Sequence, residues 1–207
     1  MISIIRADVL DVADVVAEHS VKCVVTSPPR WVGNSSTRTG FGTEPTVQEY
    51  VAHTKKAFQA IKQVLLPDGV VYWQLGGNDD AIMPARIEVM ASEELGWSVG
   101  KRVVWLRKGS HQSILRMCPG GESFVFGDDV HDWPESDYQH PEFGALPIEL
   151  IEWAILAATQ VFDTVLDPFA GSGTTGVAAG ELARNCILID RAYQDVQEER
   201  CRKWLDS

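Results

Sequence analysis

The sequence contains a Ser-Pro-Pro turn whose acceptor groups could do chemistry on an aromatic amine. Ser27, Pro28 and Pro29 directly follow residues 22–26, an apolar run typical of a buried strand. Both prolines stiffen the turn, which leaves the Ser27 hydroxyl and the Pro28 carbonyl as fixed acceptors. Accepting both hydrogens of an exocyclic NH2 group localises its lone pair on nitrogen, in line with an electrophilic methyl group. A plain turn without a ligand is the common alternative.

A second segment, residues 164–176, has the pattern of a strand, a glycine-rich turn and the start of a helix. Its glycines let the backbone approach a ligand closely, and the amides at the helix start can meet an anionic group. Asp167 precedes the glycines and can pair with a ligand ammonium. Asp190 ends the next predicted strand, where a carboxylate can accept the hydroxyl hydrogens of a ribose. This segment therefore predicts a cofactor site.

The same glycines leave other cofactors open. Gly171, Gly173 and Gly176 fit a loose dinucleotide-binding pattern, so a nicotinamide or flavin site is an alternative. Such a site needs further strand–helix units, and only 31 residues follow Gly176. Nicotinamide cofactors also lack an ammonium for Asp167. A phosphate-binding loop of the NTPase type is excluded because no Lys follows the glycines, and a glycine-rich turn without a ligand is the remaining alternative.

Alternating strands and helices must position both turns. Near-continuous apolar strands that alternate with helices are typical of a parallel sheet covered on both faces, which predicts an open α/β fold. The predicted strands are residues 3–5, 22–26, 70–75, 97–106, 123–126, 164–166 and 186–190. The predicted helices are residues 10–19, 46–66, 83–95, 147–160, 174–182 and 193–205, with a turn at 67–69.

Length and composition predict one ordinary folded domain over residues 1–207. The chain is 45% apolar and 23% charged, which excludes disorder as its main state. No run approaches the roughly 20 apolar residues of a membrane span, and Arg6 and Asp8 break the N-terminal apolar run too early for a signal peptide. Four distant cysteines without a CxxC pair favour free thiols and a cytoplasmic protein over a disulfide or zinc framework.

The net charge of −11 argues against a nucleic-acid partner until its distribution is considered. Residues 117–183 hold twelve acids and no Lys or Arg, so the remainder of the chain is near neutral. Residues 96–121 hold five basic residues and no acid. We therefore expect residues 27–38 and 101–116 to form one basic, DNA-facing side, with the acids of 122–142 turned away or engaged by a partner. Chance clustering of solvent-facing charge is the alternative.

The two turns together resemble a known family, the amino-methylating DNA methyltransferases. These enzymes transfer a methyl group from S-adenosylmethionine to cytosine N4 or adenine N6. TSPP at 26–29 is similar to their catalytic motif and DPFAGSGTT at 167–175 to their cofactor motif, in the permuted order of the β group. Shorter similar segments follow the family order at residues 6–12, 63–73, 103–109, 122–127, 140–155 and 187–193.

The resemblance implies a Rossmann-like α/β methyltransferase fold with a mostly parallel seven-stranded sheet, helices on both faces and a small target-recognition insert at about 101–144. It implies direct transfer to a base flipped out of double-stranded DNA. The implied catalytic residues are Ser27, Pro28, Pro29, Arg30 and Trp31. The implied cofactor-binding residues are Asp8, His140, Pro147, Asp167, Phe169, Gly171, Ser172, Gly173, Thr174 and Asp190. The expected DNA-binding residues are Arg38, Lys101, Arg102, Arg107, Lys108 and Arg116.

Two departures from the family pattern affect these expectations. The family usually has an aromatic residue directly after Pro-Pro that stacks on the flipped base, and Arg30 stands there in this chain, followed by Trp31. A guanidinium can also stack on a base, and Trp31 is a second candidate for that role. The insert is also short, which limits how many base edges one molecule can read.

Several alternatives stay open at this stage. Ser27 favours cytosine N4 over adenine N6, because the adenine enzymes more often have Asp or Asn at that position. A cofactor-binding protein without catalysis and an N-methyltransferase of proteins or small amines are rival functions. The acidic span 117–183 could carry a second copy or a protein partner. His111, His131 and His140 fit no tight metal-ligand spacing, so we expect no metal. We expect a cytoplasmic protein of prokaryotic or phage origin with no membrane association.

Overall fold

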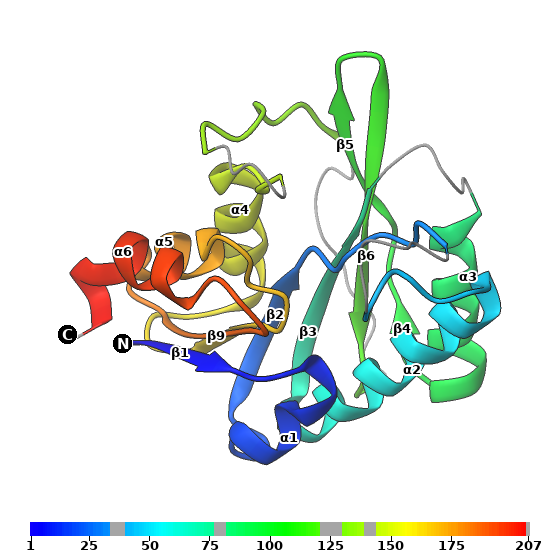
Figure 1. The fold of residues 1–207 in the computed structure, drawn as a ribbon, viewed down its shortest axis with the longest axis horizontal. Coiled ribbons are helices and arrows are strands. Elements are labelled where there is room, and N and C mark those ends of the chain that lie inside the picture. Colours follow the sequence, from blue (N-terminus) through cyan, green and yellow to red (C-terminus); the bar gives the residue numbers. More distant parts are fainter. Residues whose placement is uncertain (34–39, 77–81, 121–129, 139–143, 206–207) are drawn as a thin grey trace.

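The computed structural model describes residues 1–33, 40–76, 82–120, 130–138 and 144–205, which form one sheet with helices on both faces (Figure 1). The strands are β1 (Ile2–Arg6), β2 (Val21–Thr26), β3 (Leu65–Leu75), β4 (Ser98–Val99), β5 (Val103–Arg107), β6 (Ser110–Cys118), β7 (Val130–His131), β8 (Thr164–Asp167) and β9 (Asn185–Asp190). The helices are α1 (Val12–Val15), α2 (Val47–Val64), α3 (Met83–Val89), α4 (Ile148–Ala158), α5 (Thr174–Glu181) and α6 (Gln194–Leu205), with the short helical turns η1 (Val9–Asp11) and η2 (Met90–Glu94).

The strand order is β1-β9-β8-β2-β3-β6-β5-β7, and β4 pairs with β6. The first five strands in this order are parallel, whereas β6 runs antiparallel to β3, β4 and β5. Within the described ranges the sheet has nine strands, of which β4 and β7 have two residues each. The seven longer strands agree with the predicted mostly parallel seven-stranded sheet, and the α/β fold is confirmed.

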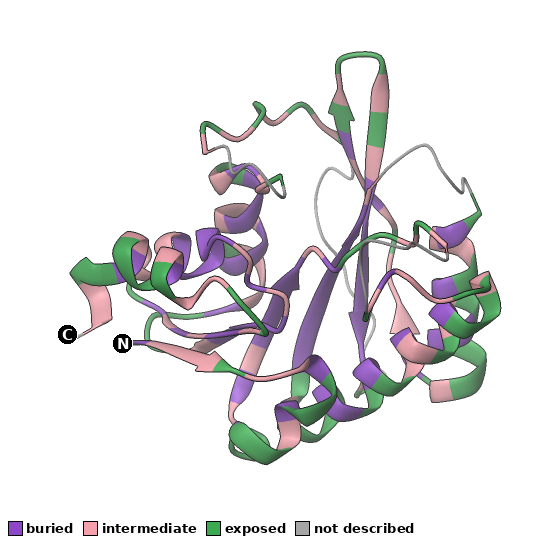
Figure 2. Cartoon of the chain, in the orientation of Figure 1, coloured by how far each residue is buried: buried purple, intermediate pink, exposed green. Residues whose placement is uncertain are grey.

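The core lies on both sides of this sheet because successive strand residues point to opposite faces. In β2, Val24 packs into the cluster that includes residues of α2 and α3, whereas Cys23 and Val25 pack into the cluster that includes residues of α4, α5 and α6. Figure 2 shows the buried residues concentrated in the central strands and on the helix sides that face them. The apolar strands of the sequence are therefore buried on both faces.

Helix α2 begins and ends close to the prediction. Thr46 accepts a hydrogen bond from the Glu49 amide, and the Glu49 side chain accepts one from the Thr46 amide, which forms a capping box. Tyr50, Phe58 and Ile61 are among the buried residues on one face of the helix. Helical spacing of apolar residues and a local cap agree here, which explains the accurate prediction.

Two predicted elements in the middle of the chain, the turn 67–69 and the strand 97–106, are wrong. Residues 67–69 do not form a turn ahead of a strand 70–75 but lie within β3. β2 pairs Val21 with Leu65 and then Cys23 with Val70, so these residues bulge within the strand. The predicted strand 97–106 is divided into β4 and β5. Strand β6 was not predicted at all, and the predicted strand 123–126 lies outside the described residues. The predicted helix 10–19 is also shorter, as η1 and α1.

The parallel strands bring the two chemical turns to one edge of the sheet. β8 lies between β9 and β2, and β2 lies between β8 and β3. The carboxyl ends of these strands are Asp190, Asp167, Thr26 and Leu75. Parallel strands present their carboxyl ends at the same edge, so Ser27 and the glycine-rich turn must face each other across it.

Candidate active site

A cavity of about 680 Å³ opens at this edge of the sheet and contacts both turns. The Ser-Pro-Pro turn contributes Ser27, Pro28, Pro29 and Arg30 to its lining. The expected cofactor residues that line it are Asp8, Asp167, Phe169, Gly171, Ser172, Thr174 and Asp190. The structure therefore brings together most of the residues that the sequence singled out.

Asp167 is a buried carboxylate that lines this cavity, with 5% of its surface exposed. Thr26 Oγ1 and Thr175 Oγ1 each donate a hydrogen bond to it at 2.6 Å, and the Phe169 amide donates another at 3.1 Å. Burial raises the pKa of Asp167 to about 6, and these three hydrogen bonds oppose that rise. A ligand cation at the cavity wall would stabilise the ionised form.

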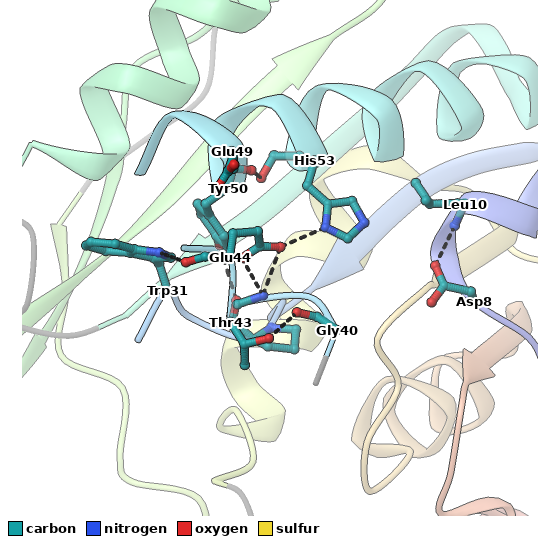
Figure 3. Close-up of polar contacts among 12 residues, drawn as sticks. Asp8, Leu10, Trp31, Gly40, Thr43, Glu44, Glu49, Tyr50 and His53 are labelled. Atoms are coloured by element: carbon teal, nitrogen blue, oxygen red, sulfur yellow. Dashed lines mark hydrogen bonds and ion pairs between the residues drawn. The ribbon is translucent and has the colours of Figure 1, made fainter. Parts of the chain in front are cut away.

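Asp190 and Asp8 are two further carboxylates that line the cavity. Asp190 accepts hydrogen bonds from the Gly171 amide at 2.8 Å and the Ala192 amide at 3.1 Å, which fixes its carboxylate at the end of β9. Burial raises the pKa of Asp190, and its backbone hydrogen bonds oppose this. Asp8 caps η1 by accepting from the Leu10 amide at 3.0 Å (Figure 3). Both carboxylates keep lone pairs that could accept hydroxyl or amino hydrogens.

The glycine-rich turn is held from behind by α6. Gln197 is fully buried and donates from Nε2 to the Gly171 carbonyl at 2.9 Å. Arg200 donates to the Ser172 carbonyl at 2.8 Å and to Thr174 Oγ1 at 2.9 Å. Gly173 has φ +76°, and a side chain there would begin 3.2 Å from Gln197, so Gly173 is needed for the turn and for packing on α6. Among the described residues that line the cavity, Gly173 is not included.

Ser27 belongs to a chain of polar side chains that crosses three strands. Its hydroxyl donates to Gln74 Oε1 at 2.5 Å, and Gln74 Nε2 donates to Gln112 Oε1 at 2.6 Å. Gln74 lies in β3 and Gln112 in β6, and both line the cavity. Neither glutamine was singled out from the sequence.

The two candidates for stacking on a base differ in position. Arg30 is exposed and lines the cavity. Trp31, by contrast, donates from Nε1 to the Glu44 carbonyl at 2.9 Å and packs against the core, and within the described residues it does not line the cavity (Figure 3). Of these two candidates the structure therefore places Arg30, and not Trp31, at the cavity.

Glu44 ties the segment after residue 40 to α2 and to Trp31. Its carboxylate accepts from the Gly42 amide and contacts His53 Nδ1 at 2.7 Å (Figure 3). Phe41 packs on His53 and also on Phe169, with ring centroids 4.6 and 4.9 Å apart. The rings of Phe41 and Phe169 thus join the two sides of the cavity.

The residues that line the cavity just before α4 are neighbours of the expected residue Pro147. Pro147 is buried as the residue that precedes α4 and, in the described part of the chain, does not line the cavity. Gly144, Ala145 and Leu146 line it instead. His140 lies outside the described residues.

The expected DNA-binding residues do not form one uniform surface. Lys101 and Lys108 are exposed, Lys108 in the turn of the β5–β6 hairpin that projects from the sheet in Figure 1. Arg116 is only 1% exposed, so its expected contact with DNA is wrong. Side chains alternate between the two faces along β6, which places Arg116 on the same face as Ile114, inside the core. Because β6 was not predicted from the sequence, the burial of Arg116 could not be predicted either. Arg38 lies outside the described residues.

Arg102 and Arg107 are each paired with a carboxylate. Arg102 donates two hydrogen bonds to Glu88, at 3.0 and 2.6 Å, and Arg107 donates two to Glu135, each of 2.6 Å. Glu135 lines the same cavity as Ser27. The acids of 122–142 were expected to turn away from the site or to be engaged by a partner. Glu135 instead lines the cavity, and Arg107 balances its charge locally.

The residues that sequence reasoning missed support the site from neighbouring elements. They are Gln74, Gln112, Glu44, Gln197 and Arg200. Gln74 was the easiest of them to predict from the sequence, because a polar residue near the end of an apolar strand is unusual. The others required knowledge of which helices and strands pack together.

Two further properties concern only the part of the chain that the structure describes. It contains no group of three His, Cys, Asp or Glu side chains placed to hold a metal ion. None of its helices combines the length and the apolar character needed to cross a membrane.

Comparisons with known proteins agree with the motifs. A family model described as DNA methylase (N6_N4_Mtase) matches residues 125–198. The type II methyltransferase M.Cfr9I of Citrobacter freundii is 24% identical over 96% of this chain and 87% of that protein. M.BglII of Bacillus subtilis is 26% identical over 93% of this chain and 67% of that protein. The M.Cfr9I alignment spans 260 positions, more than the 207 residues of this chain, so the relative carries segments without a counterpart here.

Solved structures show the same fold. The cytosine-N4-specific PvuII DNA methyltransferase has a TM-score of 0.81 at 19% identity, over 100% of this chain and 87% of that one. The M1.HpyAVI–SAM complex has a TM-score of 0.69 at 20% identity, over 97% and 98%. Together with the family model and the relatives, these matches confirm the resemblance noted from the two turns.

Proposed function

We propose that this chain, a relative of the amino-methylating DNA methyltransferases, transfers a methyl group from S-adenosylmethionine to the exocyclic amino group of a base in DNA. The observation that carries the proposal is one cavity lined by both the acceptor turn at Ser27 and the buried carboxylate of Asp167. The first suits an aromatic amino group and the second suits the ammonium group of the cofactor.

The residues of the cavity fit S-adenosylmethionine. Asp167 is an acid whose burial disfavours its charge, and a cofactor ammonium would offset that penalty. Asp190 is held by two backbone amides and can accept from ribose hydroxyls. Phe169, Gly171, Ser172 and Thr174 are proposed to shape the methionine side, and Asp8 the adenine side. The bound cofactor would supply a sulfonium methyl group, which is already a strong electrophile.

The protein's own part in the reaction is to hold and activate the amino nitrogen. Ser27 and Pro28 accept its hydrogens and localise its lone pair, and Arg30 packs on the base ring. When bound, the cofactor would supply its methyl group to this nitrogen, with cleavage of the carbon–sulfur bond and loss of one proton from the nitrogen to water. No cysteine nucleophile is required, because the nitrogen itself attacks.

We propose cytosine N4 as the preferred acceptor, with adenine N6 as the alternative. Ser27 in the first position of the turn supports cytosine. We also propose that residues 1–207 act as a single catalytic domain with a short recognition insert at about 101–144, on double-stranded DNA with a flipped target base. The acidic span 117–183 is proposed to carry a second copy or a protein partner, and the protein to act in the cytoplasm of a prokaryote.

Transfer of tritium from labelled cofactor to DNA tests this function. We expect the unsubstituted chain to label DNA and Asp167→Ala to label it roughly 30-fold more slowly or worse, because losing one partner of a buried charge pair costs about 2 kcal/mol or more. Asp14→Ala is the matched control, since Asp14 is an exposed carboxylate on α1. Equal labelling by the Asp167→Ala chain would contradict the proposal. Cofactor binding without any transfer would favour a binding protein without catalysis.

A further inference from the structure

The chain of side chains from Ser27 through Gln74 to Gln112 has a defined hydrogen-bond direction. The Ser27 hydroxyl donates to Gln74 Oε1, and Gln74 Nε2 donates to Gln112 Oε1. A serine hydroxyl has one hydrogen and two lone pairs. Because its only hydrogen is directed at Gln74, Ser27 can meet a substrate only as an acceptor.

Gln112 fixes which end of the Gln74 amide faces Ser27. If Gln74 were rotated, its NH2 group would donate to Ser27 and occupy the lone pair that the substrate needs. Such a rotation would also set the Gln74 oxygen against the Gln112 oxygen, which repels it. The bond to Gln112 therefore holds Gln74 as the acceptor of the Ser27 hydrogen.

Packing around the two amides restricts them further. Gln74 is 4% exposed and lies in β3, where its register partner in β6 is Ile114. A side chain at Gly76 would begin 3.0 Å from Gln74 Nε2 and 3.3 Å from Gln112 Nε2. The absence of a side chain at Gly76 leaves just enough room for the amide pair beside the cavity.

We infer that Gln74 and Gln112 are positioning residues that keep Ser27 an obligate acceptor for the amino group of the target base. This inference rests on the proposed methyl transfer. It adds that the acceptor is set by a neutral amide pair, which orients the hydroxyl without taking up a proton. The residues act through Ser27 and need not contact the cofactor.

Steady-state kinetics of three variants test the inference. Gln74→Leu removes the acceptor of the Ser27 hydrogen, and Gln112→Leu frees the Gln74 amide to rotate. Both should lower kcat for methyl transfer about 10-fold, as expected for an orienting hydrogen bond, with the Kd for S-adenosylmethionine unchanged. Gln112→Glu keeps an acceptor for Gln74 Nε2, so it should retain kcat within about threefold. A merely structural role would lower stability in all three and would not separate Gln112→Leu from Gln112→Glu.

An independent measurement does not require activity. In the NMR spectrum of the unsubstituted chain, the side-chain NH2 of Gln74 should exchange with water far more slowly than that of exposed Gln59, and Gln112→Leu should remove the difference. Fast exchange at Gln74 would overturn the inference whether or not the chain methylates DNA. Equal kcat in the Leu and Glu variants of an active chain would overturn it too, and would leave the proposed methyl transfer intact. Absence of transfer by the unsubstituted chain would refute the proposed function, and with it the role of the amide pair.

Discussion

Replacing Asp167 with asparagine should stabilise the cofactor-free protein while weakening its cofactor site. Burial raises the pKa of Asp167 from its ordinary value of 3.8 to about 6. That difference corresponds to about 3 kcal/mol, by which the ionised carboxylate destabilises the fold at neutral pH. Asparagine has the same shape: its oxygen can keep the bonds from Thr26 and the Phe169 amide, and its NH2 group can donate to Thr175.

The sign of the effect gives it a pH signature. Since the folded pKa of Asp167 is raised, the protonated carboxyl contributes its stability fully below pH 3.8, and this is lost as the pH rises through about 6. The free energy of unfolding of Asp167→Asn, relative to the unsubstituted chain, should therefore increase by about 2.4 kcal/mol between pH 4 and pH 7.5. Urea unfolding followed by circular dichroism measures this, with Asp14→Asn as the exposed control.

Adding the cofactor should act against this difference in stability between the two chains. With S-adenosylmethionine present at pH 7.5, the midpoint of unfolding should rise for the unsubstituted chain and much less for Asp167→Asn, because only a carboxylate pairs with the ammonium. A difference in unfolding free energy that stays flat across pH would refute the reasoning about burial. An equal cofactor-induced shift in both chains would refute the assignment of Asp167 to the ammonium.

Three other outcomes follow from the structure. The affinity for S-adenosylmethionine, measured by calorimetry, should fall as the pH drops below about 6, since protonated Asp167 cannot pair with the ammonium; a constant affinity from pH 7.5 to 5 would argue against that pairing. Gly173→Ala should lower the free energy of unfolding by about 1 to 2 kcal/mol because of its φ of +76° and the nearby Gln197, and an unchanged urea midpoint would be inconsistent with that strain. Lys108→Ala should reduce the slope of log K for DNA binding against log salt concentration by about 1. Arg116→Ala should instead lower the melting temperature, because Arg116 is buried. An altered salt slope in a folded Arg116→Ala chain would contradict the burial of Arg116.

The sequence was sufficient for the parallel half of the fold because local and global preferences agree there. Strands β2, β8 and β9 are apolar, short and followed directly by the polar turns that form the site. Their carboxyl ends must meet at one edge, so Ser27, Asp167 and Asp190 could be placed together before any coordinates. Helix α2 was equally easy to predict, since its cap at Thr46 and its apolar face both indicate a helix that begins at this point.

The antiparallel part could not be read in the same way. Strand β6 mixes polar residues with Arg116 and lacks the apolar run of the central strands, so its pairing with β3 was not visible. This single omission hid two features of the site: the burial of Arg116 and the contact between Gln112 and Gln74. Both depend on register between strands that are distant in sequence, which local patterns do not encode.

Identification of methylated nucleosides by mass spectrometry tests the central claim most directly. Genomic DNA would be digested from cells expressing the unsubstituted chain or Ser27→Ala, in a host that makes neither N4-methylcytosine nor N6-methyladenine. The account predicts N4-methylcytosine with the unsubstituted chain and none with Ser27→Ala, at equal protein levels. N6-methyladenine in its place would contradict the choice of base. No methylated nucleoside at all, from a folded chain that binds S-adenosylmethionine, would contradict the proposed methyl transfer.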